Sequence, residues 1–226
     1  MPRGIPSATV SRLVTYLRVL TDLEEAGQTR TSSDRLAAEA QVTAFQVRKD
    51  LAYFGSFGTR GSGYAVQGLR LELRRILGLT RPWKVAIVGM GRLGQALADF
   101  PQLGEYDFEL VTAFDVDPGK VGRRLGRVEV RHSDELPQVA AELGLDIAFL
   151  TVPVPAAQAA ADAIVKAGIS GILNFVPTVV TTPPHVWVET VDFLAALKRL
   201  AYFLHGRAPV DGAAPVTTEP GVDVGA

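Results

Sequence analysis

Apolar residues near the start of the chain recur at the spacing of an amphipathic helix. Between Ser7 and Ala26 they form a single stripe, which predicts a first helix over this range. The stripe consists of Val10, Leu13, Val14, Leu17 and Leu20. The run Thr31-Ser32-Ser33 contains three residues that favour the N-cap position, and it predicts a short second helix over Asp34–Ala40.

A third helix, a hairpin and a fourth helix follow. Thr43 and Gln46 have the spacing of a capping box, and the helix that they begin is expected to end before Gly55. Glycines flanked by aromatic and β-branched residues over Phe57–Tyr64 predict the hairpin. The fourth helix is expected over Gly68–Leu77. This order of elements is typical of a winged helix-turn-helix domain.

After about residue 80 the pattern changes to short apolar strands that alternate with helices. The expected strands are Lys84–Val88, Phe108–Phe114, Val128–Val130, Ile147–Thr151 and Gly171–Asn174. The expected helices are residues 92–100 and Ala156–Ala167. This alternation predicts a parallel sheet with helices on both faces, so the fold class is α/β with a winged helix-turn-helix domain in front.

Glycine and proline mark the boundaries between these parts. The segment Gly78–Pro82 joins a helix-ending glycine to a proline that cannot continue a helix. We therefore expect a winged-helix domain over residues 1–80 and a parallel-sheet domain over 81–188. A C-terminal helix follows over 189–205, and residues 206–226 lack aromatic residues and periodicity, which predicts a disordered tail.

Composition narrows the classes of protein. Of the 226 residues, 47% are apolar and 21% are charged, which is enough apolar content for a folded core. No apolar stretch reaches the roughly 18 residues of a membrane span, and Met1–Val10 does not resemble a secretory signal. A cytoplasmic protein with no membrane partner is the default. The chain has no cysteine, and His132, His185 and His205 lie far apart, so no metal site is expected.

The small net charge of −1 hides an asymmetry along the chain. Residues 1–80 carry 11 basic and 7 acidic side chains, whereas residues 81–226 carry 12 and 17. The first part is therefore basic and the second part acidic. A basic N-terminal part favours a polyanion such as nucleic acid as its partner.

A glycine-rich motif follows the first strand of the second part. Gly89, Gly91 and Gly94 form G-x-G-x-x-G, in which the glycines permit a tight turn, approach of a pyrophosphate and close packing of the next helix. Asp115 stands 21 residues beyond Gly94, at the end of the next strand, where it would bind ribose hydroxyls. Its charge would repel a 2′-phosphate, which favours NAD over NADP, although Arg123 and Arg124 lie nearby.

The third helix carries polar and basic side chains that suit DNA. Gln46, Arg48 and Lys49 lie near its N-terminal half, where recognition helices contact base edges and phosphates. Arg60, at the tip of the hairpin, is placed to reach a phosphate or the minor groove. A solvated basic face without DNA is the alternative.

The chain lacks the residues of a nicotinamide-dependent enzyme. No Tyr-x-x-x-Lys occurs, and each of the three histidines is in a context that favours a surface or packing role. We therefore expect a site that binds a dinucleotide without turning it over. An NAD-dependent oxidoreductase with a helical N-terminal extension, and a nucleotide-binding interaction module without DNA binding, remain as alternatives.

The last helix is apolar nearly all round. From Val191 to Leu204 only Asp192, Lys198 and Arg199 interrupt the apolar residues. Such a helix must be buried on most sides. It is either exchanged with a second subunit or the last core helix of its own domain.

Several segments together resemble the Rex family of redox-sensing transcriptional repressors, in one order and over residues 8–205. They are residues 11–18, 46–55, 57–64, 88–94, 114–118, 172–175 and 191–194. The resemblance implies a Rossmann-type NAD(H)-binding domain and a homodimer with exchanged C-terminal helices. It also implies binding to inverted-repeat operator DNA, from which NADH releases the repressor and NAD+ does not.

The resemblance also implies roles for individual residues. Arg48, Lys49 and Arg60 would contact DNA, and Asp192 would switch between Arg18 and another partner. Phe193 would enter the nicotinamide pocket of the partner subunit. The implied cofactor-binding residues are Gly89, Met90, Gly91, Arg92, Leu93, Gly94, Asp115, Val116, Lys120, Thr151, Val152, Pro153, Asn174 and Phe193.

One position departs from the family pattern. Some relatives carry a tyrosine after the glycine motif whose hydroxyl bonds the switch aspartate in the NADH state, and the matching residue here is Phe100. The NADH-bound state must therefore be stabilised in another way.

Overall fold

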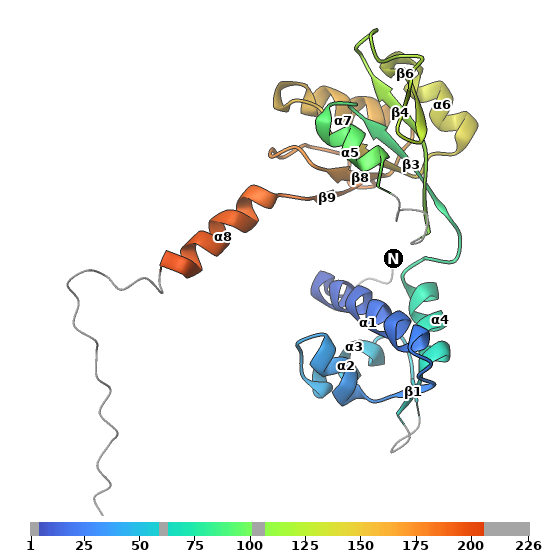
Figure 1. Ribbon diagram of the computed structural model, residues 1–226, viewed down its shortest axis with the longest axis vertical. Coiled ribbons are helices and arrows are strands. Elements are labelled where there is room, and N and C mark those ends of the chain that lie inside the picture. Colours follow the sequence, from blue (N-terminus) through green and yellow to red (C-terminus); the bar gives the residue numbers. More distant parts are fainter. Residues whose placement is uncertain (1–4, 59–62, 101–106, 206–226) are drawn as a thin grey trace, which may run out of the picture. The chain divides into compact units, whose positions relative to one another are not determined.

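The computed structural model describes residues 5–58, 63–100 and 107–205. They divide into two compact units, each with its own hydrophobic core. The first unit ends at Trp83 and also takes in residues 107–109, and the second begins at Lys84 and contains the large sheet (Figure 1). The sequence predicted the division after residue 80, and the first compact unit ends at Trp83.

The described residues of the first unit form four helices and one short pair of strands. Its elements are α1 (Ser7–Glu25), β1 (Arg30–Thr31), α2 (Ser33–Glu39), α3 (Ala44–Ala52), β2 (Tyr64–Ala65) and α4 (Val66–Ile76). Ser32 and Thr43 cap α2 and α3, because their hydroxyl oxygens accept hydrogen bonds of 3.1 Å from backbone N–H groups three residues later. The second half of the expected capping box is wrong, since the Gln46 side chain turns to Asp50 instead.

The strand before α4 pairs differently from a simple hairpin. Tyr64 lies opposite Thr31 and Ala65 opposite Arg30, so β2 pairs in antiparallel fashion with a strand that precedes α2. The tip of the expected hairpin, with Arg60, lies outside the described residues.

The buried face of α1 is shifted from the expected stripe. Leu13 and Leu20 are fully buried as expected, and Tyr16 lies between them with no exposed surface. Val10 and Val14, however, are 41% and 55% exposed. The tyrosine belongs to the core because its hydroxyl finds an internal acceptor there.

The second unit alternates strands and helices. Its elements are β3 (Trp83–Val88), α5 (Arg92–Ala98), β4 (Phe108–Asp115), β5 (Arg124–Leu125), β6 (Val128–His132), α6 (Leu136–Leu143), β7 (Ile147–Leu150), α7 (Ala157–Lys166), β8 (Gly171–Asn174), β9 (Trp187–Thr190) and α8 (Phe193–His205). Two 3₁₀ turns cover Ser133–Glu135 and Val154–Ala156.

The described strands form one sheet in the order β5-β6-β4-β3-β7-β8-β9. The pairs β4–β6, β3–β7, β7–β8 and β8–β9 are parallel, which confirms the expected parallel sheet, and β5 joins in antiparallel fashion. Right-handed crossovers run in opposite directions on the two sides of β3, which puts α5 on one face and α6 and α7 on the other (Figure 1). The order reverses between β3 and β7, and ligands bind such sheets outside the strand ends at this point.

Three of the helices and strands described in the second unit were not expected from the sequence. Helix α6 has a proline in its first turn, where the missing N–H costs nothing, and Gly144 ends it in the left-handed conformation. Strand β9 is mostly exposed at the edge of the sheet, so its sequence lacks the apolar run of a buried strand. The two-residue strand β5 is too short to leave a pattern.

The C-terminal helix α8 differs from the other helices, because none of its residues is buried. Large apolar side chains along it are between 41% and 74% exposed. Among the described residues no helix is long and apolar enough to cross a membrane.

Candidate cofactor and nucleic-acid sites

The turn between β3 and α5 is shaped by three glycines. Gly89 has a φ of +102°, and a Cβ there would lie 2.9 Å from the carbonyl group of Thr151. A Cβ on Gly94 would collide with the carbonyl oxygen of Gly89, so glycine lets α5 pack closely on β3. A Cβ on Gly91 would meet nothing within 4 Å. This open space at Gly91 is where a pyrophosphate would approach the backbone.

Three side chains from outside the turn hold it in shape. The Met90 N–H donates to Asp115 Oδ2 at 2.7 Å, and Gln95 Nε2 donates to the Met90 carbonyl at 3.0 Å. The Thr151 hydroxyl donates to the Gly89 carbonyl at 2.6 Å. Because these contacts form within the chain itself, the turn is organised before a ligand binds. The Met90 side chain is fully buried in the protein.

Asp115 lies at the end of β4 and is only 8% exposed. Its carboxylate also accepts hydrogen bonds from the Asp117 N–H at 2.8 Å and from Lys120 Nζ at 3.1 Å. Burial alone would raise the pKa of Asp115, but the hydrogen bonds from Asp117, Lys120 and Met90 outweigh it and lower the pKa below its usual value. Asp115 is therefore a fixed negative charge beside the glycine turn.

The start of α5 is exposed and follows the glycine turn directly. No side chain caps the helix at Gly91, so the N–H groups of its first turn have no side-chain acceptor. Arg92 and Leu93 are exposed there. Uncapped amides, the open space at Gly91 and the acid at the end of β4 fit the pyrophosphate and ribose of a dinucleotide.

The remaining expected cofactor residues lie at the carboxyl ends of other strands. Thr151-Val152-Pro153 follows β7, and Val116, which is 71% exposed, follows β4. Asn174 ends β8 but is fully buried, and its amide is used locally: it donates to the Thr178 carbonyl and accepts from the Val176 N–H, both at 2.9 Å. Its side chain therefore shapes the loop after β8.

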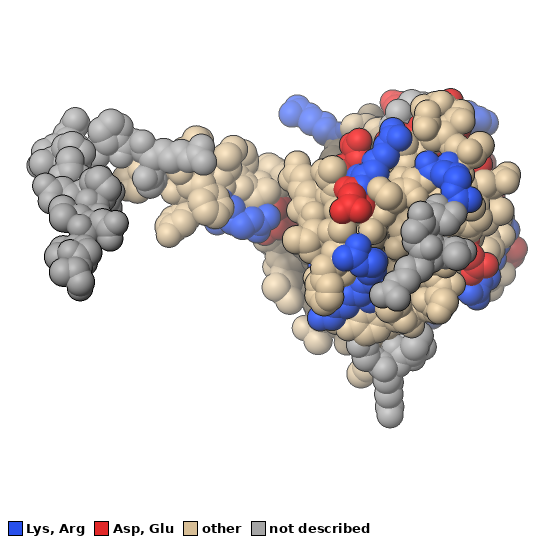
Figure 2. All heavy atoms as spheres, turned by 90° about the horizontal axis from the view of Figure 1, so that it is seen from below, with Lys and Arg blue, Asp and Glu red and all other residues tan. Residues whose placement is uncertain are grey.

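Helix α3 presents one exposed face. Val47, Asp50 and Leu51 are buried. The exposed positions follow each other at helical spacing: Phe45, Arg48, Lys49 and Ala52. Figure 2 shows basic and acidic side chains interspersed over the surface seen in that view.

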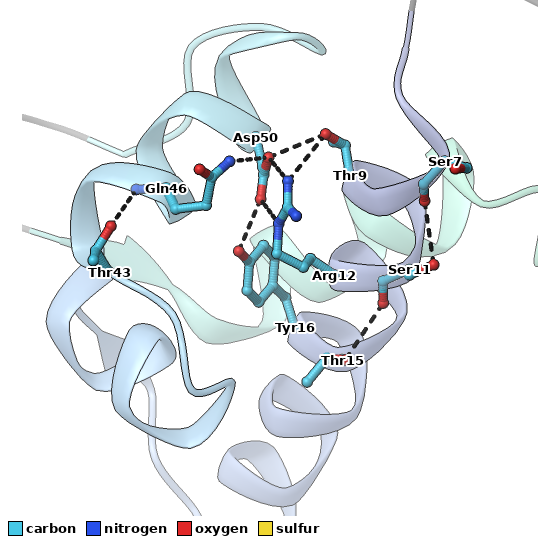
Figure 3. A network of polar contacts seen from close by, with 9 residues as sticks. All are labelled: Ser7, Thr9, Ser11, Arg12, Thr15, Tyr16, Thr43, Gln46 and Asp50. Carbon is cyan, nitrogen blue, oxygen red and sulfur yellow. Dashed lines mark hydrogen bonds and ion pairs between the residues drawn. The ribbon is translucent and has the colours of Figure 1, made fainter. Parts of the chain in front are cut away.

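A single carboxylate fixes α3 on α1. Asp50 is fully buried, and Figure 3 shows it between Gln46 on its own helix and three side chains of α1. Arg12 donates from Nε to Oδ2 at 2.6 Å and from Nη2 to Oδ1 at 2.7 Å, which is a bidentate ion pair. The Tyr16 hydroxyl donates at 2.9 Å and the Thr9 hydroxyl at 3.2 Å.

This network changes the ionisation of its members. Burial would raise the pKa of Asp50, but hydrogen bonds from Arg12, Gln46 and Tyr16 outweigh it and lower the pKa. Burial, and then the hydrogen bond to Asp50, raise the pKa of Tyr16. The pair of a charged Asp50 and a neutral Tyr16 is thus the stable state near neutral pH.

The expected DNA-contact residues differ in their surroundings. Gln46 is half-buried, and its Nε2 donates to Asp50 Oδ1 at 2.8 Å. This bond leaves Gln46 Oε1 as an acceptor. Arg48 and Lys49 are both exposed. Arg48 also donates to the Ser33 hydroxyl on α2 at 2.8 Å. Arg60 lies outside the described residues.

The expected switch residues are exposed. Arg18 lies on α1 in the first unit, and Phe100 follows α5 with 47% of its surface exposed. Asp192 precedes α8 and accepts a 2.8 Å hydrogen bond from the Ala195 N–H, so it caps this helix. Phe193 is the first residue of α8 and is 61% exposed.

The role of Asp50 and its partners on α1 was not predicted from the sequence. A signal was present, because Val47, Asp50 and Leu51 occupy the buried side of α3 and an acid there needs a partner. The partners are 34 to 41 residues away in sequence, so spacing alone could not identify them. No group of three or more metal-ligating side chains occurs among the described residues.

Two family models match the chain. Residues 80–178 match the model described as "CoA binding domain", and residues 4–52 match the model described as "Putative DNA-binding protein N-terminus". The two matches cover the glycine turn and the region of α1 to α3, respectively.

Two solved structures of one repressor are similar to this chain over most of its length. The crystal structure of RSP in complex with β-NAD+ and operator DNA has a TM-score of 0.86 and 36% identity, and covers 90% of this chain and 94% of its own. The crystal structure of RSP in complex with β-NADH has a TM-score of 0.80 and 34% identity, and covers 90% and 95%.

Curated relatives are similar over most of their length. The redox-sensing transcriptional repressor Rex of Thermus thermophilus is 60% identical over 198 residues, which covers 88% of this chain and 93% of the relative. The repressor of the same name from Deinococcus radiodurans is 51% identical, with coverages of 89% and 94%. Both relatives are named redox-sensing transcriptional repressors, which agrees with the expected regulatory role. The chain therefore belongs to the Rex family of redox-sensing transcriptional repressors.

Proposed function

We propose that this protein is a homodimeric repressor that binds inverted-repeat operator DNA and is released from it by NADH. The observation that carries the proposal is that a Rex-family chain has both an exposed basic helix face and an open glycine turn, in separate units. The relative RSP has been crystallised with β-NAD+ and operator DNA and with β-NADH. Such a regulator acts in the cytoplasm, where operator DNA and NAD(H) are both found.

We assign DNA contact to α3. Arg48 and Lys49 stand on its exposed face, and the Asp50 network fixes the direction in which this face points. Lys49 suits a phosphate, and Arg48 suits a guanine edge or a phosphate. Gln46 offers its carbonyl oxygen to a base amino group. Arg60 is the expected contact from the wing.

We assign NAD(H) binding to the glycine turn. Gly91 and the first turn of α5 would hold the pyrophosphate, and Asp115 would accept a hydrogen bond from the adenosine ribose. The charge of Asp115 opposes a 2′-phosphate, although Lys120 beside it reduces this effect. Thr151-Val152-Pro153 would border the nicotinamide.

A second copy of the chain is the proposed partner of α8. Phe193, Leu197, Tyr202 and Phe203 are each more than half exposed, and one apolar helix with no buried residue is unstable in water by itself. An exchange of this helix between two subunits would bury it twice, once in each copy. The proposed division is then a winged-helix domain over 1–80, an NAD(H)-binding domain over 81–188 and an exchanged helix over 189–205.

The proposed switch connects this helix to the cofactor and the DNA. Phe193 would reach the nicotinamide of the partner, and Asp192 would pair with Arg18 in the DNA-competent state. Asp192→Ala should then lower operator affinity without cofactor, and Phe193→Ala should blunt release by NADH. Phe100→Tyr should strengthen the response to NADH by restoring a hydroxyl. The measurement is the NADH concentration that releases half of the bound operator DNA. If this concentration is the same in all three variants as in the wild type, these roles are wrong.

The oxidoreductase alternative has little support. Thr151, the hydroxyl residue beside the glycine turn, donates to the carbonyls of Val88 and Gly89 and is not positioned as an acid or base.

The test is a titration of the protein on operator DNA. The probe is a duplex selected from a random pool by its binding to this protein. NADH should release it at concentrations at which NAD+ does not. Release by both nucleotides alike, or by neither, would contradict the proposed function.

A further inference from the structure

The exposed face of α3 contains an aromatic ring that the proposed function does not use. Phe45 is the second residue of α3, and it is 68% exposed. It is absent from the hydrophobic core of its unit, which Leu51 and Val47 enter from the opposite side of the helix. Its ring therefore does not hold α3 in place.

The position of Phe45 relative to the basic residues points to a ligand. Arg48 and Lys49 follow it by three and four residues, so all three side chains share one face of the helix. This face is oriented by the buried Asp50, whose network joins α3 to α1. Phe45 also lies in the first turn, and the N-terminal residues of recognition helices are those that reach base edges.

We propose that Phe45 recognises the C5-methyl group of a thymine in the major groove of the operator. This inference rests on the proposed function. Thymine is the base that presents a methyl group in the major groove, and an apolar side chain is its natural contact. The neighbouring cations hold the phosphates or guanine edges on either side, which brings the ring to the floor of the groove.

A protein partner fits this face less well. Arg48 and Lys49 occupy the centre of the face, and the core of a protein interface is depleted of charged side chains. A flat phosphate surface does not fit either, because it offers no apolar group to the ring. Thymine in a groove lined by phosphates satisfies both the ring and the cations.

The experiment removes one methyl group at a time. Duplexes selected by the wild-type protein are resynthesised with single thymines replaced by deoxyuridine, and the dissociation constants are measured without NADH. We expect one symmetric position in each half-site at which the loss of the methyl weakens wild-type binding about fourfold. In Phe45→Ala the same replacement should make no difference, and in Phe45→Leu, which keeps an apolar contact, it should still weaken binding.

Two control variants make the result specific. Leu71→Ala removes an exposed apolar side chain, 53% exposed, from α4 and should leave both affinity and methyl dependence unchanged. Lys49→Ala should weaken binding to the thymine and deoxyuridine duplexes by the same factor. The NADH affinity and the thermal unfolding of each variant check that its fold is intact.

The outcomes separate this inference from the proposed function. Failure of the wild-type protein to select any duplex, or to be released by NADH, would overturn the proposed function. Selection and release without methyl dependence at any thymine would overturn the role of Phe45 alone. Methyl dependence that persists in Phe45→Ala would likewise overturn it.

Discussion

The two proposed sites of this protein are built in different ways. The glycine turn is a backbone site, in which missing side chains leave room at Gly91 and allow close packing at Gly94. The face of α3 is a side-chain site, whose direction depends on one buried charge, Asp50, and its partners on α1. Adding a side chain should therefore damage the glycine turn, and removing a side chain should damage the face of α3.

The largest effect is expected at the buried charge. Asp50→Ala removes the acceptor of five hydrogen bonds and leaves Arg12, whose side chain is 25% exposed, without its ion-pair partner. We expect a loss of about 3 kcal/mol in the free energy of unfolding of the first unit, measured by urea denaturation. Glu39→Gln, at an exposed position of α2, is the control and should change this free energy by less than about 0.5 kcal/mol. Equal stability of the two variants would contradict the importance of the network.

The backbone site is tested by a pair of glycine variants. Gly94→Ala places a methyl group against the Gly89 carbonyl and should cost about 1–3 kcal/mol of stability, measured by thermal unfolding. Gly91→Ala has space for the methyl and should leave stability nearly unchanged while it weakens NADH binding. If the two variants unfold at the same temperature, the assigned roles of the glycines are wrong.

The DNA face should respond to the loss of a single cation. Arg48→Ala or Lys49→Ala should weaken operator binding by about 1–2 kcal/mol, at fixed salt concentration, while NADH binding stays the same. Fluorescence anisotropy of a labelled operator measures the first quantity. Wild-type operator affinity in both variants would remove α3 from the interface.

The cofactor preference depends on Asp115. Its charge should disfavour NADPH, and Asp115→Ala should narrow the preference for NADH while it also loosens the turn at Met90. Calorimetric titration with both nucleotides measures the change. If the wild-type protein prefers NADPH, the positive charge of Lys120 and not the negative charge of Asp115 determines the cofactor preference.

The smallest effects are expected from pH. The pKa values of Asp50 and Asp115 are lowered in the folded state, so their contribution is present above the unfolded pKa, about 4, and is lost as the pH falls through the folded values. Tyr16 has a raised pKa, so its contribution is present below the unfolded value of about 10 and is lost at higher pH. Unfolding free energies measured between pH 3 and pH 11 should thus decline at both ends. In Asp50→Ala, the acid decline should become smaller.

Sequence reasoning was most successful where the pattern is local. The cap at Thr43 and the turn at Gly89 follow from single residues and their spacing, and the structure has them as expected. The run Thr31-Ser32-Ser33 also contains the cap of α2, although this helix begins one residue earlier than expected, at Ser33. Contacts between distant segments were not predictable in this way. The Asp50 network joins residues from two helices, and Asn174 uses its amide within a loop that has no clear signature. Exposure likewise depends on how helices pack, which is why Val14 was wrongly assigned to the buried stripe.

The proposed function requires that two separately built sites are coupled in one regulator. Binding linkage makes this coupling reciprocal: the factor by which NADH weakens operator binding equals the factor by which operator DNA weakens NADH binding. The decisive measurement is therefore the dissociation constant of NADH with and without saturating operator duplex. We predict weaker NADH binding in the presence of the operator, by the same factor that the release titration gives. An NADH dissociation constant that the operator leaves unchanged would contradict the account.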